Sequence, residues 1–328
     1  MKIIAATRIL DEADIVEAFI RHSAHFVSHH ILIDNGSNDG TVEILKKLAE
    51  EGFGITVYQN RSIHYSERSF NTFMYRKAIE EFGADWIVFL DADEFLDDRK
   101  LGTGLGPYLQ NLSTSQPNLI AVKIPMVNYN YTRQDNKEEI IVPQRTTKRQ
   151  EPTTSYKIIA RAMPDLSMIT IDNGSHDVLI DGVQTDKSII ENNLWLAHYS
   201  ERHPLQIVAK FFKGWAKVLA AGQTQVDSGV SWHYKGPFYM ILQDPATLLR
   251  NEWFMTRKNE SPDLIEDPIA YKGGALKYTA VPETEMIVAK SLAGYIHDIA
   301  VQHGRLMEES PDARRLVDEW ASQQVKII

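Results

Sequence analysis

The chain of 328 residues contains no cysteine. It can therefore form no disulfide, no thiolate metal site and no cysteine nucleophile. It also has no apolar run near the roughly 18 residues that span a bilayer, so we expect no transmembrane segment. The apolar stretch at the N-terminus, MKIIAA, is too short for a secretory signal, and we expect a cytoplasmic protein.

Positive charge is in deficit, because 35 Lys and Arg face 44 Asp and Glu, giving a net charge of −9. This balance argues against general binding to nucleic acid or anionic lipid, although a local basic pocket could still bind a smaller anion. The apolar fraction of 43% and the charged fraction of 24% are typical of globular proteins and argue against disorder. The length suits one large domain or two smaller ones.

Apolar strands and amphipathic helices alternate over the first hundred residues. We expect strands at 2–6, 31–33, 55–58 and 86–90, and helices at 11–28, 41–51 and 66–82. This alternation predicts a parallel sheet with right-handed crossovers. Ligands of such sheets bind beyond the carboxyl ends of the strands.

The pattern changes after residue 118. Further strands are expected at 119–127, 156–162, 168–171 and 194–199, and strong helices at 205–221 and 283–307. We predict a first domain at 1–236 and a helical C-terminal extension at 237–328. The apolar stripe of the last helix favours packing on the first domain; self-association is the alternative, and a membrane-surface role is poorly supported because its polar face is not strongly basic.

The segment WIVFLDADEF, residues 86–95, runs a buried strand directly into Asp91, Asp93 and Glu94. Period-two alternation points Asp91 and Asp93 the same way, so their charges would raise each other's pKa unless something neutralises them. Mg²⁺ or Mn²⁺ suits carboxylates, water and phosphate oxygens. We predict a metal or phosphate site here; a solvated acidic turn is the alternative.

Two other strand ends carry polar residues. Asp34 begins the turn DNGSNDGT, where it could accept a hydrogen bond from a base or a ribose, although an ordinary turn before a helix explains the pattern equally well. Thr7 and Arg8 follow the first strand. Arg8 could meet a phosphate, but arginines are common at surface turns.

Together these three segments resemble family 2 glycosyltransferases, especially the branch with a D-x-D-E-F donor-site motif. The resemblance covers residues 1–100 and extends more loosely to about 215. It implies an α/β fold of the GT-A type, with a mostly parallel central sheet flanked by helices. It also implies a nucleotide-sugar donor, expected to be a UDP-sugar, and Mn²⁺ or Mg²⁺ as cofactor.

The resemblance assigns roles to single residues. Asp34 would contact the nucleoside, Asp91 the ribose or sugar of the donor, and Asp93 the metal, with Asp91 as a second metal ligand. The family often has Asn-Glu after the first strand, whereas this chain has Asp11-Glu12 a few residues later. Donor contacts by Thr7 and Arg8 are therefore left open.

The segment HYSER, residues 198–202, resembles the tail of the same branch, in which a late histidine completes the metal site. His198 would then be a metal ligand, and Arg202, Lys210 and Lys213 would bind the diphosphate. A surface or core histidine is the alternative. Lys157 alternates with apolar residues on its strand and could line the cleft as a donor contact.

An inverting transfer also needs a general base for the acceptor hydroxyl. Asp177 is the first candidate and Glu139 a poorer one, with His176 beside Asp177 as a further catalytic residue. The sequence thus predicts a metal-dependent, inverting glycosyltransferase acting on a hydroxyl of a glycan or other acceptor. The alternatives are an inactive nucleotide-sugar-binding protein and a phosphatase of the haloacid-dehalogenase type. The second fits less well, because its D-x-D motif usually lies on the first strand and Phe95 stands where Thr or Val is usual.

Overall fold

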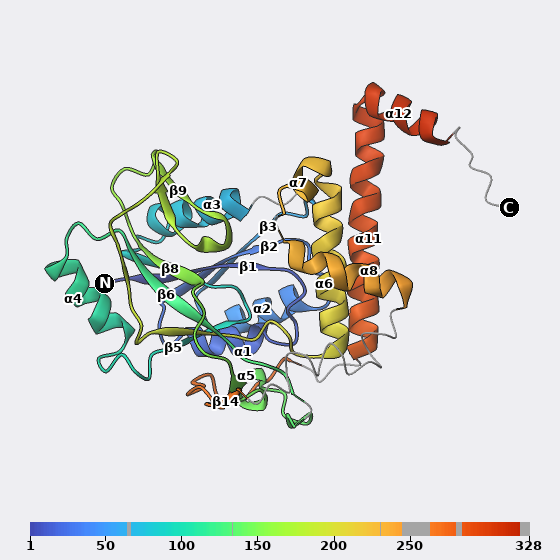
Figure 1. The fold of residues 1–328 in the computed structure, drawn as a ribbon. Coiled ribbons are helices and arrows are strands. Elements are labelled where there is room, and N and C mark those ends of the chain that lie inside the picture. The colour runs from blue at the N-terminus through green and yellow to red at the C-terminus, as the bar shows by residue number, and fades with distance from the viewer. Residues whose placement is uncertain (64–66, 133, 230, 245–262, 280–283, 322–328) are drawn as a thin grey trace.

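The structure is a computed structural model that describes residues 1–63, 67–132, 134–229, 231–244, 263–279 and 284–321. A central sheet with helices on both faces forms the body of the molecule (Figure 1). Its strands are β1 Ile3–Ile9, β2 His29–Asp34, β3 Ile55–Gln59, β4 Trp86–Phe89, β5 Glu94–Asp97, β6 Ala121–Asn128, β8 Tyr156–Arg161, β12 Ser188–Ile190 and β13 Trp195–His198. Short strands outside this sheet are β7 Lys148–Arg149, β9 Ile169–Ile171, β10 Val178–Ile180, β11 Val183–Gln184 and β14 Ile265–Glu266.

The helices fall into three groups along the chain. Those of the first half are α1 Val16–Ser23, α2 Thr41–Glu50, α3 Glu67–Glu80, α4 Leu105–Ser115 and α5 Val142–Arg145, followed by the 3-10 turn η1 Asn173–Ser175. A second group comprises α6 Pro204–Ala220, α7 Gln223–Asp227, the 3-10 turn η2 Trp232–Tyr234 and α8 Lys235–Gln243. The last group is α11 Thr284–Glu309 and α12 Pro311–Ala321. Within the described part of the chain, no helix is both long and apolar enough to cross a membrane.

The strand order of the sheet is β3-β2-β1-β4-β8-β6-β13-β5, with β12 paired to β6. The first four strands are parallel, as the alternating pattern predicts. Beyond β4 the sheet is mixed, because β8 runs antiparallel to both β4 and β6, and β5 antiparallel to β13. The α/β fold is therefore confirmed, and β8 is the strand whose direction the sequence pattern does not reveal.

Two apolar cores fill the space on either side of the sheet. One lies under α1, α2 and α4, and the other lies between the sheet and α3 with β9 and β10 (Figure 1). The helix expected at 11–28 is confined to Val16–Ser23. It starts late because Asp11 has a left-handed backbone (φ 56°) and residues 13–15 form a turn closed by the Glu12 carbonyl.

The helical C-terminal part packs against the body through α6 and α11, which lie side by side (Figure 1). The segment before α11, residues 265–279, packs against elements of the N-terminal half of the chain. There β14 pairs with β7, and the ring of Tyr271 stacks on His22. The domain boundary at 236/237 stays a prediction.

Glu17 on α1 makes several hydrogen bonds to the segment 265–279, and its side chain is fully buried. Its carboxylate accepts three consecutive backbone N–H groups, from Lys277 (2.7 Å), Tyr278 (2.8 Å) and Thr279 (2.6 Å). It also accepts the Nε–H of Arg21 at 2.9 Å. Burial raises the pKa of Glu17, but these donors outweigh it, so the pKa lies below its ordinary value.

Glu17→Gln should lower the free energy of unfolding by about 2–4 kcal/mol, because an amide presents only one acceptor oxygen to these donors. Urea unfolding at pH 7 measures the loss. The pKa of the folded state is the lower one, so the wild-type advantage should be full above pH 4.5 and shrink below it. The exposed Glu50→Gln on the next helix is the control. Equal stabilities of the two variants at pH 7 would contradict the assignment.

Candidate functional site

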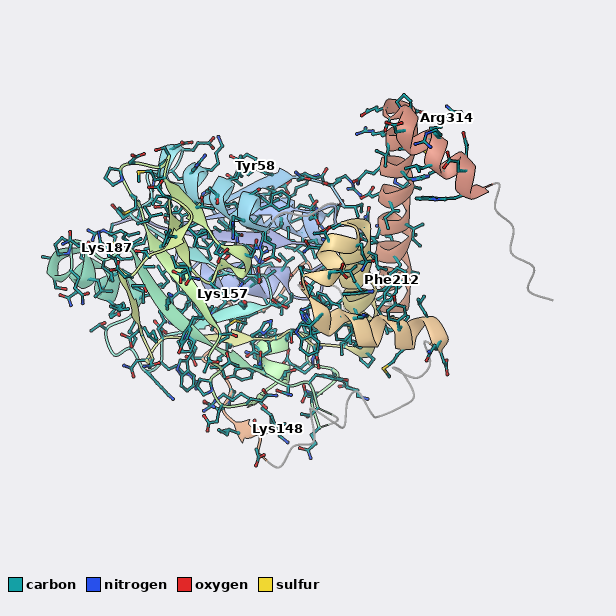
Figure 2. The ribbon with its side chains drawn as sticks, turned by 45° about the horizontal axis from the view of Figure 1, so that its top comes forward. Tyr58, Lys148, Lys157, Lys187, Phe212 and Arg314 are labelled. Atoms are coloured by element: carbon teal, nitrogen blue, oxygen red, sulfur yellow. The ribbon has the colours of Figure 1, made fainter. Side chains whose placement is uncertain are left out.

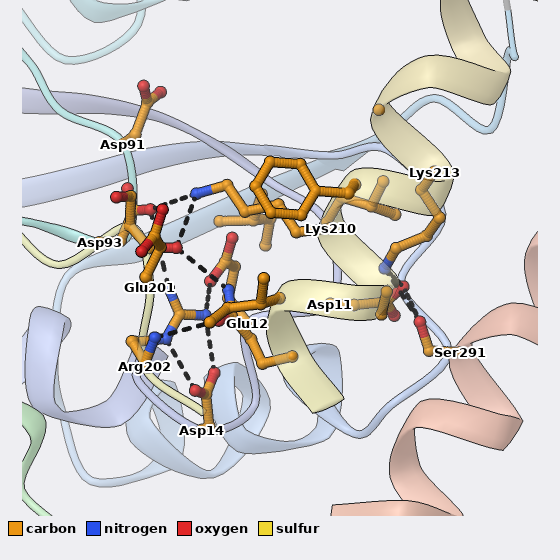
Figure 3. A pocket seen from close by; sticks show the side chains of 18 of the residues that line it. Asp11, Glu12, Asp14, Asp91, Asp93, Glu201, Arg202, Lys210, Lys213 and Ser291 are labelled. Carbon is orange, nitrogen blue, oxygen red and sulfur yellow. Dashed lines mark hydrogen bonds and ion pairs between the residues drawn. The ribbon is translucent and has the colours of Figure 1, made fainter. Parts of the chain in front are cut away.

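A cleft of about 1710 Å³ opens at the carboxyl ends of β1, β2 and β4, with α6 and α11 forming its other walls (Figure 3). Its volume exceeds that of a pocket for one small ligand, about 300–1,000 Å³, and leaves room for two substrates. Most of the site residues expected from the sequence line it: Arg8, Asp91, Asp93, Lys157, His176, His198, Arg202 and Lys210.

The acidic segment after β4 folds back on itself. The backbone N–H of Asp91 donates to the Glu94 carboxylate at 2.8 Å, and the N–H of Glu94 donates to the Asp91 carbonyl at 3.0 Å. This turn gathers the carboxylates at one strand end. Burial raises the pKa of Glu94 to about 7, with Asp91 and Asp93 adding to the effect and Lys157 opposing it.

Asp91 lies between two cations from the strands that flank β4. Its Oδ1 is 3.0 Å from Nη2 of Arg8 on β1, and its Oδ2 is 2.6 Å from Nζ of Lys157 on β8. Burial raises the pKa of Asp91, but Lys157 and Arg8 outweigh it and hold the pKa well below its usual range. Asp91 is therefore an ionised acceptor facing the cleft.

Asp93 is surrounded by basic groups. Its Oδ2 lies 3.0 Å from Nζ of Lys210, 3.6 Å from Nη1 of Arg202 and 3.7 Å from Nε2 of His198. Burial raises the pKa of Asp93, and Lys210 is the largest of the influences that bring it well below its usual range. Figure 3 shows Lys210 reaching from α6 toward Asp93.

The hydrogen bond made by Nδ1 of His198 indicates which ring nitrogen carries the proton. Nδ1–H donates to the Asn128 side-chain oxygen at 2.9 Å, which leaves a lone pair on Nε2 toward Asp93. Burial lowers the pKa of His198 to about 4, so the ring is neutral at neutral pH. A carboxylate and a neutral imidazole nitrogen that face each other suit a divalent cation between them. Within the described residues no group of three His, Asp or Glu side chains is gathered as a metal cluster, so a metal here would have two protein ligands and complete its shell elsewhere.

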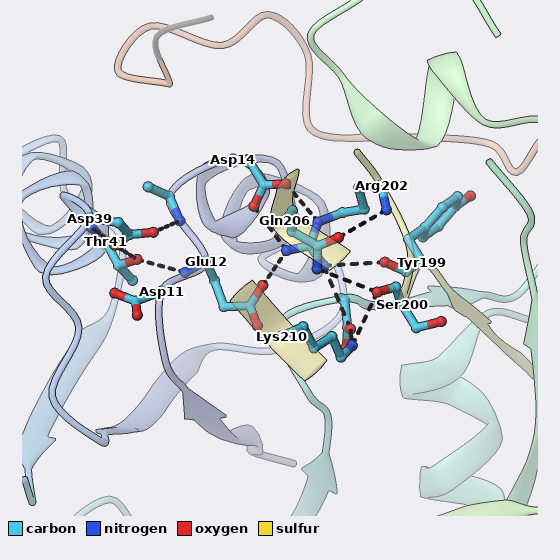
Figure 4. A network of polar contacts seen from close by, with 12 residues as sticks. Asp11, Glu12, Asp14, Asp39, Thr41, Tyr199, Ser200, Arg202, Gln206 and Lys210 are labelled. Carbon is cyan, nitrogen blue, oxygen red and sulfur yellow. Dashed lines mark hydrogen bonds and ion pairs between the residues drawn. The ribbon is translucent and has the colours of Figure 1, made fainter. Parts of the chain in front are cut away.

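Arg202 lies at the centre of a network of ion pairs and hydrogen bonds that the sequence pattern does not predict (Figure 4). It is almost fully buried and pairs with Asp14 through Nε (2.7 Å) and Nη2 (2.9 Å). Nη2 also lies 2.6 Å from Glu12 Oε2, and Nη1 donates to the Tyr199 carbonyl at 3.2 Å. Burial raises the pKa of Glu12 to about 8. With so many partners, Arg202 joins the turn after β1 to Asp93.

Three lysines on one face of α6 reach three different loops. Lys210 contacts Asp93 after β4, Lys213 contacts Asp11 after β1 (2.5 Å), and Lys217 contacts Asn35 after β2 (2.5 Å). Pro204 at the first turn and a buried apolar face built around Ile207, Phe211 and Trp215 fix the helix in this register. The helix therefore brings positive charge to the acidic edge of the sheet.

Three of the expected residues are not among those lining the cleft. Asp34 is fully buried and accepts from the Ser37 N–H (2.9 Å) and the Gln59 side chain (2.8 Å), so it shapes its own turn. Asp177 is buried against Lys123, with Nζ and Oδ2 2.5 Å apart. Thr7 is buried, and no hydrogen-bond partner for its Oγ1 is found in the described part of the chain.

His176, in contrast, faces the cleft. Its Nδ1–H donates to the Tyr156 carbonyl at 2.6 Å, which leaves Nε2 as an acceptor. The ring lies against Gly174, where φ is 66° and an added Cβ would overlap the ring. Of the two catalytic candidates in this turn, only His176 is placed to meet a substrate.

Fold and site together define an α/β protein with a large, charged cleft at the carboxyl edge of its sheet. Residues 12–163 match the family model described as Glycosyl transferase family 2. Residues 12–163 thus carry the signature of this family, and the mixed α/β sheet flanked by helices agrees with the GT-A fold expected from it. No curated protein sequence matches it.

Several solved structures are similar over part or most of the chain. A mannosyltransferase from Pyrobaculum calidifontis, in complex with GDP-Man and Mn²⁺, is 12% identical with a TM-score of 0.39, over 98% of this chain and 79% of that chain. Glucosyl-3-phosphoglycerate synthase from Mycobacterium tuberculosis, with Mn²⁺, UDP and phosphoglyceric acid, is 16% identical with a TM-score of 0.35, over 61% and 71%. Its complex with Mn²⁺, UDP-Glc and phosphoglyceric acid aligns over 38% and 43%, with 18% identity and a TM-score of 0.27. At these TM-scores the likenesses establish no common activity.

Lys210→Met should destabilise the metal-free protein by about 1–2 kcal/mol, because Asp93 loses its nearest cation while the partly exposed ammonium limits the cost. Excess Mn²⁺ should narrow the difference from wild type, since an ion at Asp93 and His198 would restore the missing charge. Thermal unfolding with and without Mn²⁺ measures both effects. Lys187→Met is the control, because Lys187 is exposed and lies far from α6 (Figure 2). A deficit that Mn²⁺ leaves unchanged would argue against a metal at Asp93.

Proposed function

We propose that this protein is a metal-dependent glycosyltransferase that moves a sugar, with inversion, from a nucleotide-sugar to a hydroxyl of a glycan or other acceptor. A UDP-sugar is the donor that the family resemblance favours. One observation carries the proposal: the Asp93 carboxylate and the neutral Nε2 of His198 face each other at 3.7 Å inside a cleft at the carboxyl edge of the sheet.

Asp93 and His198 would hold Mn²⁺ or Mg²⁺, with Asp91 close by and the donor diphosphate and water as the remaining ligands. When bound, the ion supplies positive charge to the leaving nucleoside diphosphate. Lys210, 3.0 Å from Asp93, adds a second positive charge at the same place. Arg202 adds further positive charge beside Asp93, and its ion pairs with Glu12 and Asp14 hold it in that position.

The chain's other groups orient the donor. Arg8 and Lys157 keep Asp91 ionised, so that it can accept hydrogen bonds from the ribose or sugar hydroxyls. Thr7 and Asp34 would act from beneath the cleft, at the turns after β1 and β2, where the nucleoside is expected.

His176 is the general base that the geometry favours. Its Nδ1–H is held by the Tyr156 carbonyl, so Nε2 can take the proton of the acceptor hydroxyl as that oxygen attacks the sugar. Asp177 lies behind it and is paired with Lys123. We therefore assign proton transfer to His176 and leave Asp177 a role in fixing the turn.

Asp93→Asn should weaken UDP binding in the presence of Mn²⁺ by about 10- to 100-fold, because a neutral amide is a poor ligand for the ion. Calorimetry with UDP, and with GDP in parallel, with Mn²⁺ and with EDTA, measures this. Asp186→Asn, on an exposed turn, is the control. Wild-type binding that is indifferent to Mn²⁺ would contradict the proposal. Metal-dependent binding without turnover of any UDP- or GDP-sugar would indicate a binding protein.

His176→Gln should lower the rate of sugar transfer, or of donor hydrolysis, by about 10²- to 10⁴-fold while leaving the affinity for UDP within about twofold. Asp177→Asn is the comparison. A larger loss of rate in Asp177→Asn than in His176→Gln would reverse the two assignments.

A further inference from the structure

One stripe of α11 crosses the turns that follow β1, β2 and β3. Its members are Ser291, Gly294, Asp298 and Gln302, whose spacing of three and four residues places them on a single face of the helix. Together they meet the turns after β1, β2 and β3 at the carboxyl edge of the sheet. The stripe thus contacts, from the far end of the chain, the loops where the nucleoside is expected to bind.

The first contact is at the turn after β1. Ser291 Oγ–H donates to Asp11 Oδ2 at 2.7 Å and accepts from Nζ of Lys213 at 2.9 Å. The other oxygen of Asp11 accepts the backbone N–H of Asn38 at 2.7 Å. Through Asp11, α11 is therefore bonded to the loop 34–41 as well.

The last contacts are at the turn after β3. Asp298 Oδ2 is 2.9 Å from Nη2 of Arg61. The Gln302 amide pairs with the backbone on both sides of this turn, donating to the Arg61 carbonyl (2.7 Å) and accepting from the Ile63 N–H (2.9 Å). An amide that satisfies two backbone groups holds the turn in one position.

Between these contacts the helix touches the loop 34–41 directly. A Cβ added at Gly294 would overlap Cγ and Nδ2 of Asn38. The Asn38 side chain has little freedom to move, because Nδ2 donates to the Gly36 carbonyl at 2.8 Å and Oδ1 accepts from Arg61 at 3.2 Å. Only glycine at position 294 permits this approach.

We propose that α11 is a positioning element of the nucleotide site, and that the missing side chain of Gly294 allows it to hold the loop 34–41 in its binding arrangement. Residues 35, 39 and 40 of this loop line the cleft, whereas Gly294, Asp298 and Gln302 do not. The helix therefore sets the affinity for a nucleoside diphosphate without contacting it at these positions. This inference rests on the proposed function.

The test compares two glycines of the same helix. Gly294→Ala should weaken UDP binding in Mn²⁺ by about tenfold or more, because the new methyl displaces Asn38 and with it the loop. Gly304→Ala is the matched control, since no atom lies within 4 Å of a Cβ there. Alanine favours the helix equally at both sites, so a difference in affinity isolates the close approach. Calorimetry measures binding, with GDP in parallel, and thermal unfolding of the metal-free proteins accompanies it.

A double-mutant cycle with Asn38→Gly separates positioning from general damage. In the Asn38→Gly background the Cβ, Cγ and Nδ2 atoms that the methyl would overlap are gone, so Gly294→Ala should cost less than about twofold in affinity. An equal loss in both backgrounds, or unchanged affinity in Gly294→Ala, would overturn the inference. If Gly294→Ala does not fold, UDP binding by Gln302→Ala is measured instead. An affinity of this variant equal to that of the wild type would overturn the inference. Failure of the wild type to bind UDP or GDP would refute the proposed function, which is a distinguishable result.

Discussion

Three carboxylates follow one buried strand, and the free energy of burying their charges governs what surrounds them. Asp91, Asp93 and Glu94 leave β4 together, and an unpaired charge in such a place would cost several kcal/mol. Part of this charge is neutralised from within the sheet, because β4 lies between β1 and β8, which contribute Arg8 and Lys157. The antiparallel strand β8 therefore does more than extend the sheet beside β4: its Lys157 also pairs with the Asp91 carboxylate.

The remaining charge is supplied from outside the sheet. The lysines of α6 reach the loops after β1, β2 and β4, so one helix joins the carboxyl edge, and two of them, Lys210 and Lys213, neutralise carboxylates there. Since α11 packs on α6 and meets the same loops, the C-terminal part of the chain belongs to the site as much as the strands do. The net charge of −9 is compatible with an anionic ligand for this reason: the acidic groups of the cleft are matched locally by cations.

Local sequence signals sufficed for the longer strands of the sheet, for helices α1, α2, α3, α6 and α11 and for the acidic turn after β4, because each depends on neighbouring residues. They missed the short strands β5 and β12 and the helix α4. Contacts over long separations could not be read in this way. Glu17 gives no sign in the sequence that it binds backbone groups some 260 positions away. Glu12 and Asp14 look like the start of a helix, yet they form a turn that pairs with Arg202. Likewise, Asp177 fits the pattern of a base, but it is buried against Lys123 and does not line the cleft, whereas His176 does.

The position of α11 has a consequence for biosynthesis. The loops it holds are made within the first 63 residues, whereas its last contact with them is made by Gln302. The chain is synthesised from its N-terminus, and domains generally fold as units during synthesis. All strands of the central sheet are made by residue 198, so the sheet can form before α11 exists, but the carboxyl edge acquires its final arrangement only after residue 302 has emerged. A nascent or prematurely terminated chain would hold a folded sheet with an unfinished site.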